Sequence, residues 1–340
     1  MRSPEQLRRI PKAELHVHLD GSLRPATLID LARPAGVSLP SADPEEIRRF
    51  MAVRRARDLD EYLSRFALTI AVLQTPESLE RVAWEMVEDA WRDGIRYLEV
   101  RYCPALSTKD GLPLDDAIAA EWRGLERGAA DFGVAVGMIN CTLRHLDPDQ
   151  SADIASASVQ GRGRGVVAFD IAGAEAHHAA APHAAAFELA RLGGLATTAH
   201  AGEAAGPASI REALDVLGIQ RIGHATTLIQ DSGLMTEVRS EGITIEACLS
   251  SNYQTSAIAS LGQHPLAAYL RAGLKVTLCS DNWLMSDVTL SGEYALAQRE
   301  LGLTDREVDQ LVLNGLAGAF AAAPVKERLM EEARDALAAA

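Results

Sequence analysis

The sequence predicts an α/β fold, most economically a (β/α)8 TIM barrel formed as a single domain over residues 1–340. Eight short apolar runs rich in β-branched residues alternate with longer segments whose apolar residues recur every three or four positions. Such alternation implies right-handed βαβ units, and a single α/β barrel commonly has this length. A doubly wound open sheet also fits the alternation, because the number of strands does not show whether the sheet closes.

Each predicted strand is a short run bounded by polar residues or glycine. The eight runs are 13–18, 95–102, 134–143, 165–173, 195–200, 221–225, 243–250 and 275–281. Residues 79–94, LERVAWEMVEDAWRDG, have helical spacing and end in a glycine stop. The first two strands are separated by residues 22–94, which have helical patterns and are too long for an ordinary crossover. We therefore expect a helical insert that covers the C-terminal mouth of the barrel.

Composition and charge exclude several classes of function. The formal net charge of −14, with no run of Lys or Arg, argues against binding to nucleic acid or a membrane surface. The N-terminus lacks the apolar segment of a secretory signal, so a soluble cytoplasmic protein is expected, as a monomer or a homodimer. The cysteines are widely spaced without a C-x-x-C pair, which predicts free buried thiols at Cys103, Cys141, Cys248 and Cys279.

The segment KAELHVHLDGS, residues 12–22, places two histidines in the first predicted strand. His16 and His18 are two apart, so they project from the same face of a strand and can converge on one point. This is a geometry that suits a metal, although an isolated H-x-H also occurs as two packed histidines. Further ligands are needed to decide between these interpretations.

Further candidates lie at the ends of three other predicted strands. TAHAGE contains His200 and Glu203, RIGHA contains His224, and LCSDN contains Asp281 and Asn282. In a parallel barrel all C-terminal strand ends open onto one face, where catalytic residues gather. Taken singly, His224 fits a core histidine and Asp281 fits a helix cap. The remaining histidines fall outside the pattern and are interpreted as surface or packing residues: His145, His177, His178, His183 and His264.

Imidazoles combined with a carboxylate suit zinc, and an open coordination position for water makes such a site catalytic. Zinc lowers the pKa of bound water to about 7. Glu203, three residues beyond a ligand, is placed to give a proton to a heteroatom, and an additional histidine can position or deprotonate the water. The sequence therefore predicts hydrolysis or hydrolytic deamination.

These motifs together resemble the adenosine deaminase family of zinc-dependent amidohydrolases. The resemblance extends along nearly the whole chain, through PKAELHVHLDGSLRP, YLEVRYCP, CTLRH, VVAFDIAG, HAGE, RIGH, SSNYQT and VTLCSDN. It implies one zinc ion per subunit, held by His16, His18, His200 and Asp281. It also implies that Glu203 protonates purine N1 and that His224 orients the hydroxide that attacks C6.

The resemblance also implies a substrate pocket. Gly173 matches the position whose backbone N–H contacts purine N3, and Asp20 matches the position near the ribose 5′-hydroxyl, which favours a nucleoside over adenine. A hydrophobic lid over the ribose is expected from residues spaced along one helix face, although the same spacing fits core packing: Leu59, Tyr62, Leu63 and Phe66.

Four positions depart from the family pattern. Asn282 replaces the second of two consecutive aspartates, and an amide can still donate a hydrogen bond to purine N7 through its NH2 group. Trp283 follows where proline is usual, Ala174 stands where an acid is common, and Ala225 where glycine is common. These changes place the substrate preference in doubt without removing a ligand or the proton donor.

The sequence predicts deamination of adenosine and 2′-deoxyadenosine, in purine salvage. Adenine, an N6-substituted purine nucleoside and aminodeoxyfutalosine remain alternatives within the same chemistry. A non-catalytic purine nucleoside-binding barrel and a secreted growth-factor-like relative are alternatives of a different class, which the complete set of ligands and the missing signal peptide disfavour. A cytidine-deaminase-type enzyme is disfavoured because H-x-E with P-C-x-x-C is missing.

Overall fold

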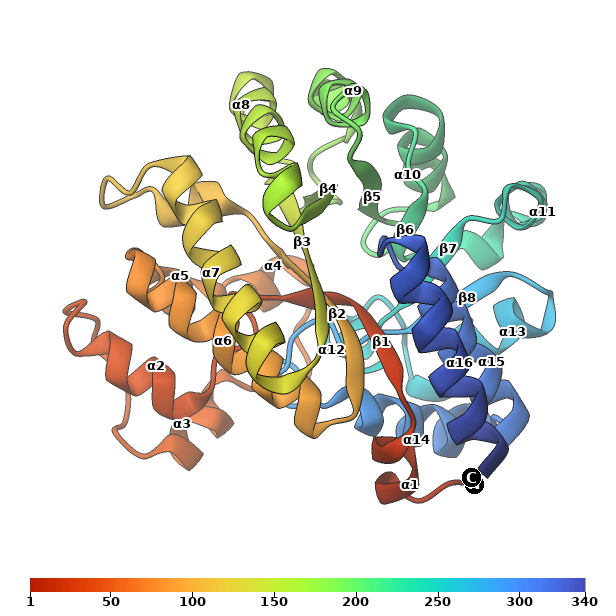
Figure 1. Cartoon of the computed structure of the whole chain (residues 1–340). Coiled ribbons are helices and arrows are strands. Elements are labelled where there is room, and N and C mark those ends of the chain that lie inside the picture. Colours follow the sequence, from red (N-terminus) through yellow and green to blue (C-terminus); the bar gives the residue numbers. More distant parts are fainter. Residues whose placement is uncertain (340) are drawn as a thin grey trace.

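The computed structural model describes residues 1–339 and consists of eight parallel strands surrounded by helices (Figure 1). The strands follow one another around the sheet in sequence order. Their bounds are β1 Lys12–His18, β2 Ile95–Tyr102, β3 Ala135–Leu143, β4 Val166–Ala172, β5 Ala196–Ala201, β6 Arg221–His224, β7 Thr244–Ala247 and β8 Lys275–Leu278. The predicted (β/α)8 barrel is confirmed, and the doubly wound alternative is wrong.

The barrel closes between β1 and the segment just after β8. Val17 and Asp281 form an isolated parallel bridge. The backbone N–H of Asp281 donates to the carbonyl of His16 at 2.8 Å, and the N–H of His18 donates to the carbonyl of Asp281 at 2.8 Å. The closing hydrogen bonds therefore belong to three of the residues that the sequence predicts as metal ligands.

Most of the helices surround the ring of strands (Figure 1). The α-helices are α1 Pro4–Arg9, α2 Pro25–Ala32, α3 Pro44–Met51, α4 Leu59–Leu63, α5 Phe66–Val72, α6 Pro76–Arg92, α7 Leu114–Phe132, α8 Pro148–Gln160, α9 Ala184–Leu192, α10 Pro207–Glu212, α11 Ser232–Glu241, α12 Leu249–Gln254, α13 Leu266–Arg271, α14 Leu290–Leu301, α15 Asp305–Gly318 and α16 Ala323–Ala339. Short 3₁₀ turns are η1 Pro104–Ser107, η2 Arg162–Arg164, η3 Ala181–His183, η5 Leu228–Gln230 and η6 Leu261–Gln263, and η4, Ala213–Leu217, is a π-helical turn.

Local sequence explains the bounds of α6, the longest helix before β2. Thr75 caps its N-terminus in a capping box with Ser78, Pro76 occupies the first turn, and the chain leaves the helix at Gly94 with φ +79°. The helix packs against β2 and α7, so it belongs to the outer ring of the barrel. The segment additional to a plain barrel is consequently α2 to α5, which is shorter than the predicted 22–94.

Two predicted strands are shorter in the structure than in the sequence analysis. The segment predicted as 243–250 leaves the sheet after Ala247 and enters α12 at Leu249. The segment predicted as 275–281 ends as a regular strand at Leu278. Apolar runs do not distinguish a strand from a short buried helix, which explains the end of β7. After β8 the backbone is irregular at Cys279 and Ser280, and Asp281 forms only an isolated bridge with Val17.

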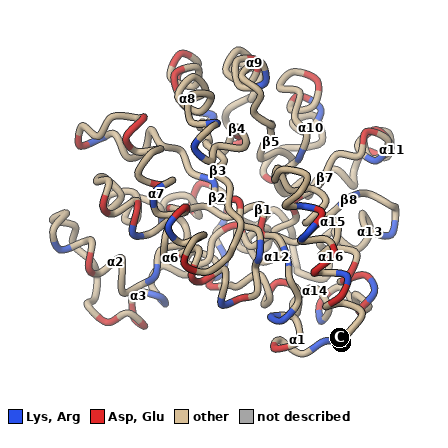
Figure 2. The backbone as a smooth tube through the Cα atoms, in the orientation of Figure 1, with Lys and Arg blue, Asp and Glu red and all other residues tan. Residues whose placement is uncertain are grey.

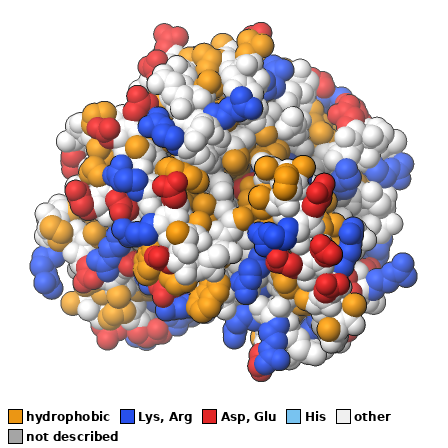
Figure 3. All heavy atoms as spheres, viewed as in Figure 1, with side chains coloured by type: hydrophobic (Ala, Val, Ile, Leu, Met, Phe, Trp, Pro, Cys, Tyr) orange, Lys and Arg blue, Asp and Glu red, His pale blue; other side chains and the backbone are white. Residues whose placement is uncertain are grey.

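Charged residues are distributed over the outer helices in Figure 2, and acidic and basic side chains are interspersed with apolar ones on the face in Figure 3. None of the helices within residues 1–339 combines the length and the apolar character needed to cross a bilayer. All four cysteines are free and buried, as predicted.

A buried lysine begins β1, at the end of the barrel opposite the C-terminal ends of the strands. Lys12 is 1% exposed, and its Nζ donates to the carbonyls of Leu7 at 3.0 Å and Ile10 at 3.1 Å. Burial lowers the pKa of Lys12 to about 8. Between about pH 8 and the usual pKa of 10.5, the folded protein holds this side chain neutral while the unfolded chain keeps it charged.

We expect the free energy of unfolding to rise across this pH range, because unfolding then takes up a proton. The rise approaches about 3 kcal/mol, since one pKa unit corresponds to about 1.4 kcal/mol. Urea unfolding of the wild type and of Lys12→Met at pH 7.5, 9 and 10.5 measures it as the difference between the two proteins. An identical pH dependence in both would contradict this interpretation.

Candidate active site

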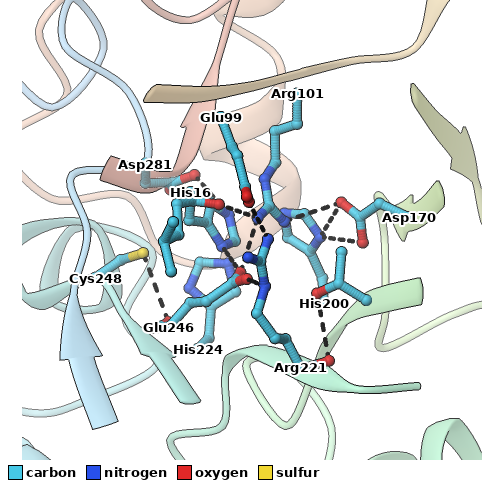
Figure 4. Close-up of polar contacts among 12 residues, drawn as sticks. His16, Glu99, Arg101, Asp170, His200, Arg221, His224, Glu246, Cys248 and Asp281 are labelled. Carbon is cyan, nitrogen blue, oxygen red and sulfur yellow. Dashed lines mark hydrogen bonds and ion pairs between the residues drawn. The ribbon is translucent and has the colours of Figure 1, made fainter. Parts of the chain in front are cut away.

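Five side chains from three strands and the turn after β8 converge at the C-terminal mouth of the barrel, and Figure 4 labels His16, His200, His224 and Asp281 among them. One nitrogen or oxygen atom from each of His16, His200, His224 and Asp281 lies within 4.8 Å of the others, and all four residues are buried. His18 joins them, because its Nε2 lies 3.1 Å from Nε2 of His200 and 3.3 Å from Oδ1 of Asp281. The structure therefore brings together all the residues predicted as ligands, and adds His224 to the same cluster.

Two of these residues have an unusual backbone conformation. His224 and Asp281 have φ values of +65° and +64°, and Ala225 has φ +50°. The left-handed region costs a non-glycine residue free energy and occurs mainly where the surrounding structure imposes it, often at functional sites. The strand ends turn sharply here, and both side chains remain buried.

A buried ionic network that the sequence analysis missed lies beneath the imidazoles. Arg101 is fully buried, and its guanidinium contacts Oδ2 of Asp170 at 3.0 Å and Oε2 of Glu246 at 2.8 Å (Figure 4). Burial would raise the pKa of Asp170 and Glu246, but nearby positive charge, Arg101 in both cases, more than offsets it, so both pKa values lie well below their usual range. Both carboxylates are therefore charged, and they accept hydrogen bonds.

These two carboxylates orient two of the histidines. Glu246 accepts from Nδ1 of His16 at 2.9 Å, and Asp170 lies 3.1 Å from Nδ1 of His200. With the proton on Nδ1, the Nε2 atom of each ring presents a lone pair to the cluster. His16 Nε2 is buried and has no hydrogen-bond partner.

The cluster fits a divalent cation such as zinc. Oδ2 of Asp281 accepts from the hydroxyl of Ser251 at 2.5 Å, which leaves Oδ1 facing His16 Nε2 at 3.4 Å. Imidazole nitrogens and a carboxylate oxygen are ligands that zinc prefers. In zinc sites the other ring nitrogen or carboxylate oxygen of each ligand typically forms a hydrogen bond with a neighbouring group. A cation would also satisfy the lone pair of His16 Nε2, which is otherwise buried without a partner.

Glu203 lies beside this cluster as a protonated acid. Its Oε1 accepts from the hydroxyl of Thr255 at 3.0 Å, and its Oε2 lies 3.5 Å from Nε2 of His224. Burial raises the pKa of Glu203 to about 8, with the charge of Asp281 acting in the same direction. At neutral pH the carboxyl group therefore holds a proton that it can donate.

Glu175, another residue that the sequence analysis missed, holds the loop that carries Glu203. Its carboxylate accepts hydrogen bonds from four consecutive backbone N–H groups, at distances of 2.6 to 3.1 Å, and from the hydroxyl of Ser209. The four donors are Gly202, Glu203, Ala204 and Ala205. This clamp fixes the backbone from which the acid projects.

A cavity of about 240 Å³ opens onto Glu203 and the cluster. The residues predicted to bind substrate all line it: His18, Asp20, Leu59, Tyr62, Leu63, Phe66, Gly173 and Asn282. Leu59 to Leu63 belong to α4 and Phe66 begins α5, so the single apolar helix face predicted from their spacing is divided between two helices. His145 lines the cavity as well, in contrast to its interpretation as a surface or packing residue.

Glycine is required at one position that lines this cavity and at one position that lies against a lining residue. A Cβ atom on Gly21 would lie 1.6 Å from Oδ1 of Asn282, so a side chain at position 21 would displace the amide. Gly173 has φ +100°, a conformation that a residue with a Cβ rarely adopts, while the space around it is open. The backbone of Gly173 can thus approach a ligand closely.

The comparisons with known proteins agree with this chemistry. The family model for adenosine deaminase matches residues 11–336. The chain belongs to the adenosine deaminase family. An adenosine deaminase of Shewanella halifaxensis is 37% identical over 327 residues, which cover 95% of this chain and 98% of that protein. A probable adenosine deaminase of Dictyostelium discoideum is also 37% identical over 327 residues, and this chain spans 42% of its length.

Solved structures of family members share the fold over nearly the whole chain. The adenine deaminase of Arthrobacter aurescens has a TM-score of 0.89 at 27% identity and covers 96% of this chain and 98% of its own. The N6-methyl-AMP deaminase of Arabidopsis thaliana has a TM-score of 0.85 at 28% identity and covers 98% of both chains. An amidohydrolase from Burkholderia ambifaria with bound zinc has a TM-score of 0.86 at 26% identity and covers 99% of this chain and 95% of its own. This adenosine deaminase family member is a hydrolytic deaminase.

The missed residues had a signal in the sequence. Arg101, Asp170 and Glu246 are single charges inside strands that are otherwise apolar, in LEVRY, AFDIA and ITIEA. A charge in a buried strand requires a partner, because an unpaired buried charge is strongly unfavourable. The sequence indicates that such partners exist but not which charges meet.

We expect Glu175→Ala to lower the free energy of unfolding of the metal-loaded protein by at least about 3 kcal/mol, since hydrogen bonds to a charged group contribute about 1.5–3 kcal/mol each. We also expect kcat to fall, because the loop carrying Glu203 loses its clamp. Urea unfolding and single-turnover kinetics measure the two effects. Glu241→Ala, at an exposed glutamate ending α11, is the matched control. Equal stabilities of the two variants would contradict the clamp.

Proposed function

We propose that this enzyme deaminates adenosine and 2′-deoxyadenosine to inosine and 2′-deoxyinosine, with zinc as cofactor. The observation that carries the proposal is the polarity of the cavity. Asp20 lines it, 5% exposed, and its Oδ1 has no hydrogen-bond partner, while no lysine or arginine is among the lining residues.

The cavity suits a nucleoside better than a nucleotide. Burial raises the pKa of Asp20 to about 7, and a ribose hydroxyl can pair with either form, by donating to the carboxylate or by accepting from the acid. A 5′-phosphate would bring a second anion next to this group with no guanidinium or ammonium lining the cavity to compensate. This distinguishes the proposed substrate from that of the N6-methyl-AMP deaminase that shares the fold.

Apolar residues favour a nucleoside over free adenine. One wall of the cavity consists of side chains from the insert and the neighbouring turn: Leu59, Tyr62, Leu63, Phe66, Ile70 and Leu106. A free base would leave much of this wall in contact with water, whereas a ribose would cover it. Asp20 supplies a partner for a hydroxyl that adenine lacks.

Three groups are proposed to hold the purine. Glu203, protonated at neutral pH, faces N1, the backbone N–H of Gly173 donates to N3, and the amide of Asn282 donates to N7. Asn282 is 2% exposed and lines the cavity, and its Oδ1 is buried without a hydrogen-bond partner among the described residues. An amide donor works without being protonated, so recognition of N7 does not depend on pH at this position.

The proposed zinc ligands are the four residues that the sequence analysis indicated. His16, His18, His200 and Asp281 would hold zinc, which, when bound, supplies a Lewis acid that lowers the pKa of water to about 7. Glu203 gives its proton to N1, which makes C6 more electrophilic. His224 donates a hydrogen bond that orients the attacking oxygen. The exocyclic NH2 group takes up one proton of the consumed water and leaves as ammonia, and the other proton of that water restores the acid form of Glu203, so that one water is consumed for each ammonia released.

The proposal is tested by kcat/KM for ammonia release from adenosine, 2′-deoxyadenosine, adenine, AMP and N6-methyl-AMP, with zinc-loaded protein. We expect kcat/KM for the two unmodified nucleosides to exceed that for every other compound by at least about 100-fold. Binding of a monophosphate is disfavoured because its phosphate would lie beside the buried Asp20 without a cationic side chain to compensate its charge. Glu203→Gln should lose nearly all turnover and serves as the inactive control. A preference for adenine or for a monophosphate would refute the proposed substrate.

Metal content distinguishes the two histidines that compete for the fourth ligand position. We expect His18→Ala to lower tightly bound zinc to below about half an equivalent, because removing one of four ligands weakens a zinc site severely. His224→Ala should retain about one equivalent. Elemental analysis after dialysis against a weak chelator measures both, and the reverse result would replace His18 by His224 in the ligand set.

A further inference from the structure

A chain of buried hydrogen bonds runs from the backbone of α13 to His224. The N–H of Leu266 donates to Nδ1 of His264 at 3.1 Å, and Nε2 of His264 lies 3.1 Å from Oδ1 of Asn252. Nδ2 of Asn252 lies 2.9 Å from Nδ1 of His224. His264, Asn252 and His224 are 4%, 0% and 2% exposed.

The direction of this chain is set by its first member. A backbone N–H can only donate, so Nδ1 of His264 accepts, and the proton of this imidazole is on Nε2. Burial lowers the pKa of His264 to about 3, so the ring carries a single proton at neutral pH. The Nε2–H therefore donates to Oδ1 of Asn252, which turns the NH2 group of the amide toward His224.

The same logic fixes the last member. Because the amide of Asn252 donates to Nδ1 of His224, that nitrogen cannot carry a proton, and a neutral His224 holds its proton on Nε2. Nε2 is the atom that lies 3.5 Å from Oε2 of Glu203, and the ring centre lies 4.8 Å from that of His16. The proton thus points into the active site.

We infer that Asn252 and His264 are positioning residues that lock His224 in the tautomer with its proton on Nε2. His224 is then a hydrogen-bond donor to the attacking oxygen and not a metal ligand, because a protonated nitrogen has no lone pair for a cation. The catalytic consequence rests on the proposed function, whereas the tautomer itself does not depend on the substrate. His264, interpreted from the sequence as a surface or packing residue, acquires a functional role.

The tautomer can be measured directly in the zinc-loaded protein labelled with 15N-histidine. Long-range 1H–15N correlation spectra distinguish the protonated from the unprotonated ring nitrogen, and the signals of His224 and His264 are assigned by their loss in His224→Gln and His264→Gln. We expect protonated Nε2 and unprotonated Nδ1 for both rings at pH 7. A proton on Nδ1 of His224 would overturn the inference, whatever the enzyme deaminates.

Asn252→Asp reverses the last hydrogen bond with almost no change of shape. A carboxylate accepts from both histidines, so the proton of His224 should move to Nδ1, with Nε2 unprotonated. We expect kcat to fall at least about 100-fold with KM changed less than about threefold, since holding the wrong tautomer costs a serine protease about 10⁴ in kcat. An unchanged tautomer or an unchanged kcat in this variant would overturn the inference.

Two further variants separate positioning from folding. His264→Gln keeps one acceptor for the N–H of Leu266 and one donor for Asn252. This variant should retain the tautomer of His224, with kcat within about fivefold of the wild type. In His264→Ala the amide of Asn252 is free to flip, so His224 should populate both tautomers. Asn314→Asp makes the same amide-to-acid change at a half-buried site outside the cavity, where Nδ2 donates to the carbonyl of Val276, and should behave as wild type. Equal losses of kcat in His264→Gln and His264→Ala would assign His264 a merely structural role.

Discussion

Arg101 is a fully buried cation at the centre of the barrel, and the chemistry of the active site depends on how it is neutralised. Its ion pairs with Asp170 and Glu246 keep both carboxylates charged in surroundings where burial alone would protonate them. Charged, they can accept from Nδ1 of His200 and His16, which directs the Nε2 lone pairs toward the cluster. Replacing one member of such a network leaves an unpaired buried charge, which is far more costly than the pair is stabilising. The orientation of the two proposed metal-binding imidazoles therefore depends on the ion pairs of the barrel interior.

The closing contact of the barrel is also part of the active site. Asp281 exchanges backbone hydrogen bonds with His16 and His18, and its left-handed backbone conformation is imposed at the point where the last strand meets the first. Strain of this kind persists only where the surrounding structure enforces it. A distortion of the closure would move three proposed ligands together, so the fold and the geometry of the cluster cannot vary independently.

Specificity in this protein arises from what surrounds the cluster. The acid Glu203 depends on the clamp of Glu175 on its loop, and Asn282 depends on the absence of a side chain at Gly21. Under the proposed function, Asp20 would select against a second anion, because the described residues that line the cavity include no arginine or lysine. An adenine deaminase and an N6-methyl-AMP deaminase share this fold, so the barrel by itself does not determine the substrate; we propose that polar side chains around the cavity do.

The sequence by itself determined the alternation of eight strands with helices and the residues that meet at one end of the strands, because period-two and period-3.6 patterns are local and the C-terminal ends of parallel strands share one face. It left the closure into a barrel open, because eight strands also fit an open sheet. It did not locate the ends of β7 and β8, since an apolar run does not show where regular strand pairing stops: a short helix follows β7, and irregular backbone follows β8. Only the tertiary structure paired Arg101 with its two carboxylates and connected His264 through Asn252 to His224. Each of these contacts joins residues far apart in the chain or in different elements, and the direction of a hydrogen bond depends on which donor reaches which acceptor, which spacing along the sequence does not encode.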